Sequence, residues 1–224
     1  MDSTELLRKL SECVEMGKVN KDAPFPPAMK GMDGADELTK QALEMGIKPI
    51  EILNDALISA MEKVGEKFSQ KKIFVPQMLI SAKAMNASME HLKPFFQSGE
   101  VKRKGKFIIG TVAGDLHDIG KNLVAMIVEG AGWEVIDLGV DVKTPKFLQA
   151  IADHPDAIVG LSALLTTTMQ SMKNTVSEIH AQYPNIKLIV GGAPVTDAFS
   201  KEIGANAYAH DPQGAVSYLN AQVA

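Results

Sequence analysis

The sequence is poor in several features that would direct it towards particular functions. Cys13 is its one cysteine, which excludes an intrachain disulfide and a thiolate cluster for zinc or iron–sulfur and fits a reducing compartment. Its net charge is only −4, so we expect neither a nucleic acid nor an anionic membrane as a partner. No apolar run reaches the ~18 residues of a membrane span, and the start MDSTELLRKL lacks the apolar core of a signal peptide. These absences predict a cytoplasmic globular protein.

The first part of the chain, residues 1–97, has the apolar spacing of helices. Four segments repeat apolar residues every three or four positions, which is the pattern of helices that each bury one face. Gly17 and Gly46 follow the first two segments, and Pro49 and Pro76 open the other two. This part therefore predicts a four-helix bundle.

The segment between the first two helices, residues 18–34, has no apolar period. Its sequence KVNKDAPFPPAMKGMDG is rich in proline and glycine, which predicts a surface loop. Two interpretations of its central part, residues 21–32, stay open: a segment that binds a partner, or a tolerated insertion.

The second part of the chain has a different pattern. Residues 98–105 are polar and basic and predict a solvated linker between two domains. From 106 to 224, short apolar segments alternate with amphipathic ones, with Thr144 and Asp211 expected as N-caps of two helices. Five such units predict an α/β domain with a doubly wound parallel sheet, of the flavodoxin-like or Rossmann-like kind, in strand order 2-1-3-4-5.

Polar and small residues gather at the carboxyl ends of these strands, where sheets of this order bind ligands. GDLHDIG follows the first strand, Ser162 ends the third with a run of threonines behind it, and Gly191-Gly192 end the fourth. His117 can offer one ring nitrogen to a metal while the other donates to a carboxylate, either Asp115 or Asp118. Since no second strong ligand is near in sequence, a conventional zinc or iron site is not supported. A single ligand suits a metal held by a macrocycle.

Other residues that could bind ligands have an ordinary structural interpretation. His91, His154 and His180 are expected to be polar residues satisfied by their neighbours. Methionines are common in the first hundred residues, where flexible core filling is the favoured interpretation over a surface that adapts to a ligand.

Three short motifs at fixed spacing make this sequence resemble cobalamin-binding proteins. The family signature D-x-H-x-x-G reads Asp115–Gly120, S-x-L reads Ser162–Leu164, and G-G reads Gly191–Gly192. The first two motifs are separated by the 41 residues 121–161 and the last two by the 26 residues 165–190, which matches the family spacing.

The resemblance implies a corrinoid cofactor, cobalamin or a relative, bound base-off/His-on. His117 would then be the metal ligand in the lower axial position on cobalt, with Asp115 as its hydrogen-bond partner. Thr168 stands where methionine synthase has a serine that completes the relay. The displaced nucleotide tail would enter a pocket lined by the serine, the first threonine and the glycine pair. The residues at this edge with an implied role in cofactor binding are Asp115, His117, Asp118, Gly120, Ser162, Leu164, Thr166, Thr168, Gly191 and Gly192.

The helical part carries the resemblance as well. FVPQMLISAKAMNASMEHLKPF resembles the cap helix of methionine synthase, and ALEMGIKPIEIL is typical of small corrinoid proteins of methanogen and acetogen methyltransferase systems. Residues 1–97 would thus cap the upper corrin face, 98–105 would be a hinge, and 106–224 would be the cobalamin-binding domain. The residues implied to cover the bound methyl group are Phe74, Met78, Ala82 and Met85.

The activity implied by the resemblance is that of a methyl carrier. The chain would accept a methyl group on Co(I) from a donor-specific methyltransferase. It would pass the group to a second methyltransferase that acts on coenzyme M or tetrahydrofolate, and a reductive activase is a further implied partner. We expect a carrier subunit with no catalytic residue of its own. Methanol, methylamines, methoxyaromatics and betaines all stay open as donors.

Three alternatives remain at this point. The small subunit of a B12-dependent mutase shares the D-x-H-x-x-G motif but usually lacks a helical cap. A B12-based regulator of transcription requires an output module such as a helix-turn-helix, and no segment resembles one. A flavodoxin-like protein without cobalt would stay colourless after addition of hydroxocobalamin.

Overall fold

The computed structural model describes residues 2–223, except for the side chain of Gln97. The chain divides between residues 103 and 104 into a helical unit and an α/β unit, with residues 130–132 counted with the first. No helix in the described part of the chain is long and apolar enough to cross a membrane.

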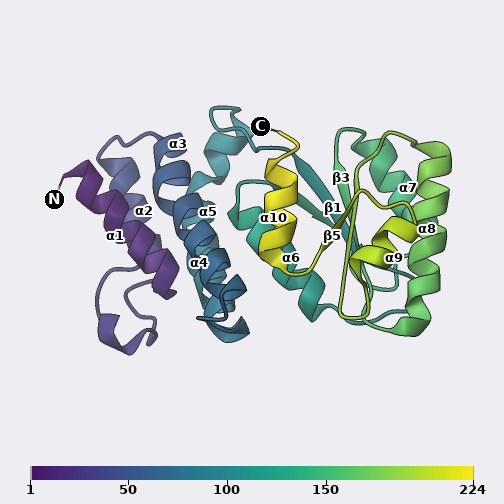
Figure 1. Cartoon of the computed structure of the whole chain (residues 1–224). Helices are drawn as coiled ribbons and strands as arrows, with labels where there is room; N and C mark the ends of the chain where they lie inside the picture. The colour runs from purple at the N-terminus through teal and green to yellow at the C-terminus, as the bar shows by residue number, and fades with distance from the viewer. Residues whose placement is uncertain (1, 224) are drawn as a thin grey trace. The chain divides into compact units, whose positions relative to one another are not determined.

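The helical unit contains the predicted helices, which lie side by side in Figure 1. The helix α1 begins after Asp2, whose carboxylate accepts from the Glu5 N–H at 2.8 Å, and ends at Gly17 in the left-handed conformation. The third predicted helix is continuous from Pro49 to Ser69 but is π-helical in its middle. The elements are α1 (Ser3–Met16), η1 (Pro27–Met29), α2 (Ala35–Glu44), α3 (Pro49–Glu51), η2 (Ile52–Ile58), α4 (Ser59–Ser69) and α5 (Val75–Gln97).

The apolar stripes of these helices form the core of the unit, as predicted. Burial of each such side chain stabilises the fold by about 1.5–3 kcal/mol. Three residues at the three- and four-residue spacing of these stripes, Ile50, Phe68 and Phe96, are not buried: Ile50 is 37% exposed and the two phenylalanines are partly exposed. The π-helical segment Ile52–Ile58 changes the number of residues per turn between Ile50 and the rest of its stripe. The buried residues of the stripes include Leu6, Leu10, Cys13, Leu53, Leu57, Met61, Val64, Met78, Ala82, Met85, Met89 and Leu92.

The predicted surface loop between α1 and α2 is tied down by two charged side chains. Lys18 is fully buried, and its ammonium donates to the backbone carbonyls of Ala23 at 2.8 Å and Lys21 at 3.4 Å. The Glu37 carboxylate accepts from the backbone N–H groups of Lys21 at 2.9 Å and Gly34 at 2.8 Å. Lys18 therefore holds the loop together from within, and Glu37 ties it to α2.

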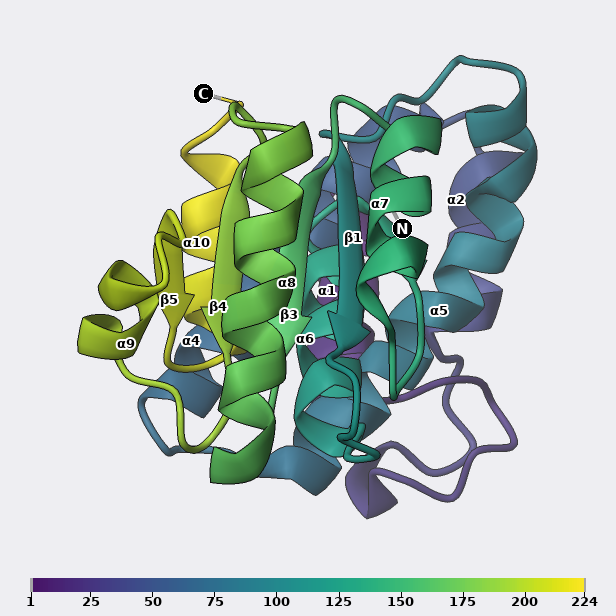
Figure 2. The same ribbon diagram turned by 90° about the vertical axis from the view of Figure 1, so that its right-hand side faces the viewer.

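The α/β unit has the predicted sheet. Its five strands are all parallel and follow the order β2-β1-β3-β4-β5, which confirms the predicted topology. Figure 2 shows α7 and α8 on one face of the sheet and α6 and α10 on the other. The strands are β1 (Lys106–Thr111), β2 (Glu134–Asp137), β3 (Ile158–Ser162), β4 (Leu188–Gly191) and β5 (Ala207–Ala209). The helices are α6 (Ile119–Gly130), α7 (Thr144–Asp153), η3 (Thr166–Thr168), α8 (Met169–Gln182), α9 (Asp197–Glu202) and α10 (Pro212–Asn220).

Helix caps in this unit agree with the sequence in one case and differ in another. Asp211 caps α10 as predicted, because its carboxylate accepts from the Gly214 N–H at 2.7 Å. The prediction that Thr144 is an N-cap is wrong: Lys143 occupies the cap position and Thr144 is the first helical residue. The Thr144 hydroxyl instead lies 3.0 Å from the Thr175 hydroxyl on α8, so it contacts a neighbouring helix rather than the backbone of its own.

Candidate functional site

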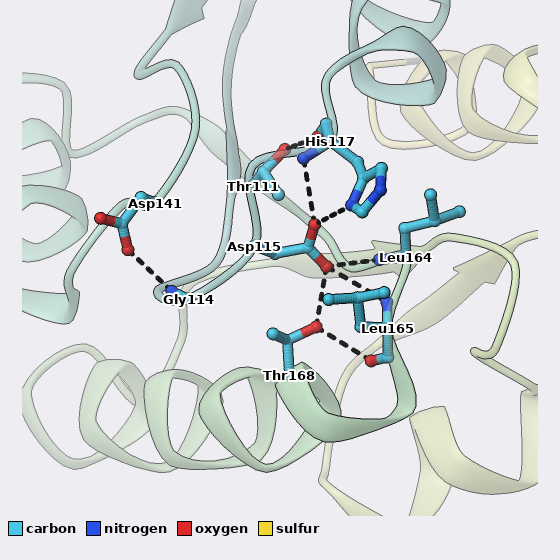
Figure 3. A network of polar contacts seen from close by, with 8 residues as sticks. All are labelled: Thr111, Gly114, Asp115, His117, Asp141, Leu164, Leu165 and Thr168. Atoms are coloured by element: carbon cyan, nitrogen blue, oxygen red, sulfur yellow. Dashed lines mark hydrogen bonds and ion pairs between the residues drawn. The ribbon is translucent and has the colours of Figure 1, made fainter.

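The predicted site lies on the turn between β1 and α6, at the carboxyl edge of the sheet (Figure 3). This edge is the point where the strand order reverses between β1 and β3. The Asp115 side chain is fully buried there, whereas the His117 side chain is 51% exposed. The Thr111 hydroxyl at the end of β1 donates to the His117 carbonyl at 2.9 Å, which closes the turn.

Asp115 orients the imidazole of His117. Its Oδ1 lies 2.8 Å from His117 Nδ1 and also accepts from the His117 backbone N–H at 3.1 Å. A carboxylate only accepts hydrogen bonds, so Nδ1 carries the ring proton and Nε2 keeps its lone pair. Figure 3 shows the ring extending away from Asp115. The geometry thus presents one basic nitrogen at the edge of the sheet.

The second oxygen of Asp115 is held by the turn after β3. Oδ2 accepts from the backbone N–H of Leu164 at 2.7 Å, the N–H of Leu165 at 3.2 Å and the Thr168 hydroxyl at 2.8 Å. Burial alone raises the pKa of Asp115, but the hydrogen bonds from Leu164, Thr168 and His117 outweigh it and hold the pKa well below its usual range. Asp115 is therefore a buried, charged acceptor at neutral pH.

The structure thus joins the three side chains that the sequence suggested as a relay: the Thr168 hydroxyl, the Asp115 carboxylate and the His117 imidazole. Asp118, the other possible partner of the histidine, has a different contact. Its carboxylate accepts from the Asn122 amide at 3.1 Å, one helical turn further along α6. The partner of His117 is therefore Asp115, as the resemblance implied, although the residue types alone left both aspartates open.

A cavity of about 610 Å³ opens beside His117 within the α/β unit. Glycines make room for its walls: a Cβ at Gly160 would lie 2.4 Å from Phe107 Cζ, and a Cβ at Gly192 would lie 1.8 Å from the Ala163 carbonyl oxygen. Gly192 also has a φ of +123°, which strongly favours glycine. The lining is supplied by the four strands β1, β3, β4 and β5 and by α6 and α10.

Most of the predicted edge residues border this cavity. Asp115 and Thr168 are buried behind His117 rather than in the lining, and Thr166 is exposed on the 3-10 turn outside the lining. The predicted residues in the lining are His117, Asp118, Gly120, Ser162, Leu164, Gly191 and Gly192. The sequence analysis did not identify the apolar walls, which include Phe107, Ile109, Leu123, Val124, Ile189, Pro212 and Ala215. Alternation along β1 was the available signal, since Phe107 and Ile109 point to the same face.

The predicted cap residues differ among themselves in exposure. Phe74, which precedes α5, is 66% exposed. Met78, Ala82 and Met85 are at most 2% exposed. In this conformation only Phe74 offers its surface to a ligand, and a covering role for the four residues stays a prediction.

Two of the other histidines have the ordinary contacts that we expected. His91 Nε2 lies 2.7 Å from Asp36 in the helical unit, and His154 Nδ1 lies 3.3 Å from the Lys106 ammonium. Within residues 2–223, no group of three or more histidine, cysteine, aspartate or glutamate side chains could hold a metal ion. A single protein ligand such as His117 suits a metal that is already held by a macrocycle. One outward nitrogen beside a large, mostly aliphatic cavity fits a corrinoid with a nucleotide tail.

Comparison with protein families agrees with this chemistry. A family model described as a B12 binding domain matches residues 105–216, and a second model of the same description matches residues 32–93.

Similar proteins and structures extend over nearly the whole chain. Trimethylamine corrinoid protein 1 of Methanosarcina acetivorans is 37% identical over 191 residues, which cover 84% of this chain and 88% of that protein. Dimethylamine corrinoid protein 1 of Methanosarcina mazei is 36% identical over 216 residues, 95% of this chain and 94% of that protein. A chain of the methanol:cobalamin methyltransferase complex MtaBC of Methanosarcina barkeri superposes with a TM-score of 0.82 at 28% identity, covering 98% of this chain and 80% of that chain. The chain therefore belongs to the B12-binding corrinoid proteins of methyltransferase systems.

Proposed function

We propose that this chain carries methyl groups derived from a methylamine, on a corrinoid whose cobalt is ligated from below by His117. The donor-specific methyltransferase would load the methyl group, and a second methyltransferase acting on coenzyme M or tetrahydrofolate would remove it. A reductive activase would restore the cofactor after oxidation. The bound corrinoid supplies the cobalt that carries the methyl group, and the protein supplies binding, orientation and electrostatics.

The observation that carries this proposal is the hydrogen-bonded series from Thr168 through Asp115 to His117. Because Asp115 accepts from Nδ1 at 2.8 Å, Nε2 is the nitrogen left to bind cobalt. A charged acceptor behind the ring also raises the basicity of Nε2, which strengthens it as a ligand. Thr168 and the N–H groups of Leu164 and Leu165 keep the carboxylate charged and in place.

The cavity beside His117 would hold the nucleotide tail in the base-off form. Its volume of about 610 Å³ lies within the range of pockets that bury small organic ligands, roughly 300–1,000 Å³. Ser162 supplies a hydroxyl on one wall, while Gly191 and Gly192 allow the backbone to approach the ligand closely. The base at the end of the nucleotide tail of cobalamin is a benzimidazole, which is largely apolar and suits the apolar walls.

The names of the relatives support methylamines as the donor class. The corrinoid proteins matched over 84–97% of this chain are named for trimethylamine and dimethylamine. The superposed MtaBC complex contains a methanol methyltransferase and supports an enzyme of that kind as the partner.

The first test is reconstitution of the purified protein with hydroxocobalamin, followed by desalting and absorption spectroscopy. We expect a coloured protein with a base-off/His-on spectrum in the wild type, and weakened retention or a shifted Co(III) spectrum in His117→Ala. The reduced holo-protein is then incubated with methyltransferases specific for trimethylamine, dimethylamine and methanol, each with its substrate. Methylation by a methylamine enzyme supports the proposal, methylation by the methanol enzyme alone contradicts the donor class, and a colourless protein contradicts the whole proposal.

A further inference from the structure

The turn after β2 lies directly against the turn that carries His117. The Thr111 N–H donates to the Gly139 carbonyl at 3.0 Å, and the Val142 N–H donates to the Thr111 carbonyl at 2.9 Å. An isolated parallel bridge pairs Val112 with Val142 just beyond the last residue of β1. Residues 139–142 thus continue the backbone pairing of the sheet to the start of the His117 turn.

Asp141 makes two further contacts from the middle of this segment. Its backbone N–H donates to the Asp115 carbonyl at 2.9 Å. Its side-chain Oδ1 accepts from the Gly114 N–H at 2.7 Å, 27 positions earlier in the chain (Figure 3). A single residue therefore binds two consecutive residues of the His117 turn, Gly114 with its side chain and Asp115 with its main chain.

The backbone conformation of Asp141 limits which residues fit at this position. Its φ is +50°, a left-handed conformation that residues other than glycine, asparagine and aspartate rarely adopt. Glycine would meet this conformational demand alone. Aspartate meets it and adds a charged acceptor, whose hydrogen bond to Gly114 is of the stronger, charge-assisted kind.

We propose that Asp141 is a positioning residue for the axial ligand, an inference that rests on the function proposed above. Asp115 is held on two sides. The turn after β3 binds its carboxylate, and Asp141 binds its carbonyl and the N–H of the residue before it, Gly114. Asp141 thereby fixes the backbone from which the Asp115 carboxylate reaches His117 Nδ1. Without the Gly114 contact, Asp115 and the His117 ring sample more orientations, and a smaller share of the protein presents Nε2 to cobalt.

The test compares Asp141→Gly, Asp141→Asn and the wild type, each reconstituted with cobalamin. Glycine accepts a φ of +50° and keeps the N–H contact to Asp115 but removes the acceptor, while asparagine keeps an acceptor oxygen. A matched control is Asp156→Gly, the same substitution in the exposed turn that precedes β3. The measurements are the dissociation rate of Co(III) cobalamin and the histidine-nitrogen splitting in the Co(II) electron paramagnetic resonance spectrum of protein that contains ¹⁵N-labelled histidine, with circular dichroism as a check of folding.

We expect Asp141→Gly to release cobalamin about five- to tenfold faster, the factor that corresponds to one lost hydrogen bond, and to show a mixture of nitrogen-ligated and unligated cobalt. Asp141→Asn and Asp156→Gly should resemble the wild type. A fully nitrogen-ligated spectrum and an unchanged release rate in Asp141→Gly would overturn the role of Asp141, and so would a defect of equal size in Asp141→Asn. Absence of the two-component splitting of ¹⁵N histidine in the wild type would instead overturn the proposed function itself.

Discussion

The two units of this chain relate sequence to site in different ways. In the α/β unit, Asp115 contacts Leu164 and Thr168, which lie 49 and 53 positions further along the chain. All three follow strand ends, so the parallel topology brings them together. In the helical unit, one apolar segment contains both the exposed Phe74 and the buried Met85, because helical spacing identifies an apolar face but not what covers it. A polar residue at a strand end is therefore stronger evidence for a ligand site than an apolar residue in a helical stripe.

The largest effect within the α/β unit is expected from Asp115→Ala. The substitution removes a fully buried carboxylate and leaves the N–H groups of Leu164 and Leu165 and the buried Thr168 hydroxyl without their acceptor, so we expect a loss of about 3 kcal/mol in the free energy of unfolding. Chemical denaturation measures this loss. The control is Asp118→Ala, an exposed carboxylate three positions away that contacts Asn122, with a change within about 0.5 kcal/mol. Equal effects of the two substitutions would contradict the stabilising role assigned to the hydrogen bonds of Asp115.

The same carboxylate predicts a pH dependence. The pKa of Asp115 is lower in the folded protein than in the unfolded chain, so the unfolded chain takes up the proton first as the pH falls. The stability that Asp115 contributes is therefore fully present above the ordinary aspartate pKa, about 3.9, and is lost as the pH falls further. Denaturation curves of the wild type and Asp115→Asn should converge at acidic pH, and a constant difference between them would contradict the assigned charge.

The second comparison is between Met85→Ala and Phe74→Ala in the helical unit. Met85 is 2% exposed, so its truncation leaves a cavity and is expected to cost about 2–5 kcal/mol. Phe74 is 66% exposed, so its truncation should change stability by at most about 0.5 kcal/mol. If Phe74 covers the cofactor as predicted, Phe74→Ala should instead accelerate loss of the methyl group from the methylated protein. An unchanged rate of methyl loss would remove Phe74 from that role.

The substitution Gly120→Ala separates stability from cofactor binding within the α/β unit. Gly120 lies in the first turn of α6 and lines the cavity, and a Cβ placed there would have open space around it. Gly120→Ala should therefore stabilise the apoprotein by about 0.5 kcal/mol, because alanine favours the helix, and yet weaken cobalamin binding by occupying the site. Thermal denaturation and cobalamin titration measure the two effects, and tighter binding by the variant would contradict the assignment of the cavity.

The reactivity of Cys13 tests how tightly α1 packs in the helical unit. Burial, with a smaller contribution from the nearby Glu12 carboxylate, raises the pKa of the Cys13 thiol to about 11. The native protein at pH 8 should therefore react with a thiol reagent far more slowly than the denatured protein. Equally fast labelling of both forms would show that α1 opens readily and that its packing is looser than described.

The sequence predicted the topology and most of the edge residues because both depend on local features. Glycines and prolines mark where each element ends, and parallel strand order then determines which ends meet. The residue types alone narrowed the partner of His117 to two aspartates, Asp115 and Asp118, because both lie within two positions of it, and only the resemblance favoured Asp115. The structure decides between them through the turn after β3, which is distant in sequence.

The features that the sequence did not predict depend on tertiary contacts. Thr144 has the residue type of an N-cap, but its hydroxyl contacts Thr175 on another helix. Lys18 has a charge that usually stays in solvent, yet its ammonium is buried among backbone carbonyls. No feature of the sequence around Asp141 distinguishes it, because its hydrogen bond to Gly114 depends on the pairing of β1 with β2.

The most direct test of the central claim is the Co(II) electron paramagnetic resonance spectrum of cobalamin-loaded protein that contains histidine labelled with ¹⁵N. If His117 ligates cobalt, each nitrogen-split line should change from the three components given by ¹⁴N to the two given by ¹⁵N. Unlabelled protein should keep three components, and labelled His117→Ala should lose the two-component pattern. A three-component pattern in the labelled wild type would show that the cofactor's own base is still the ligand, and it would contradict the assignment of His117.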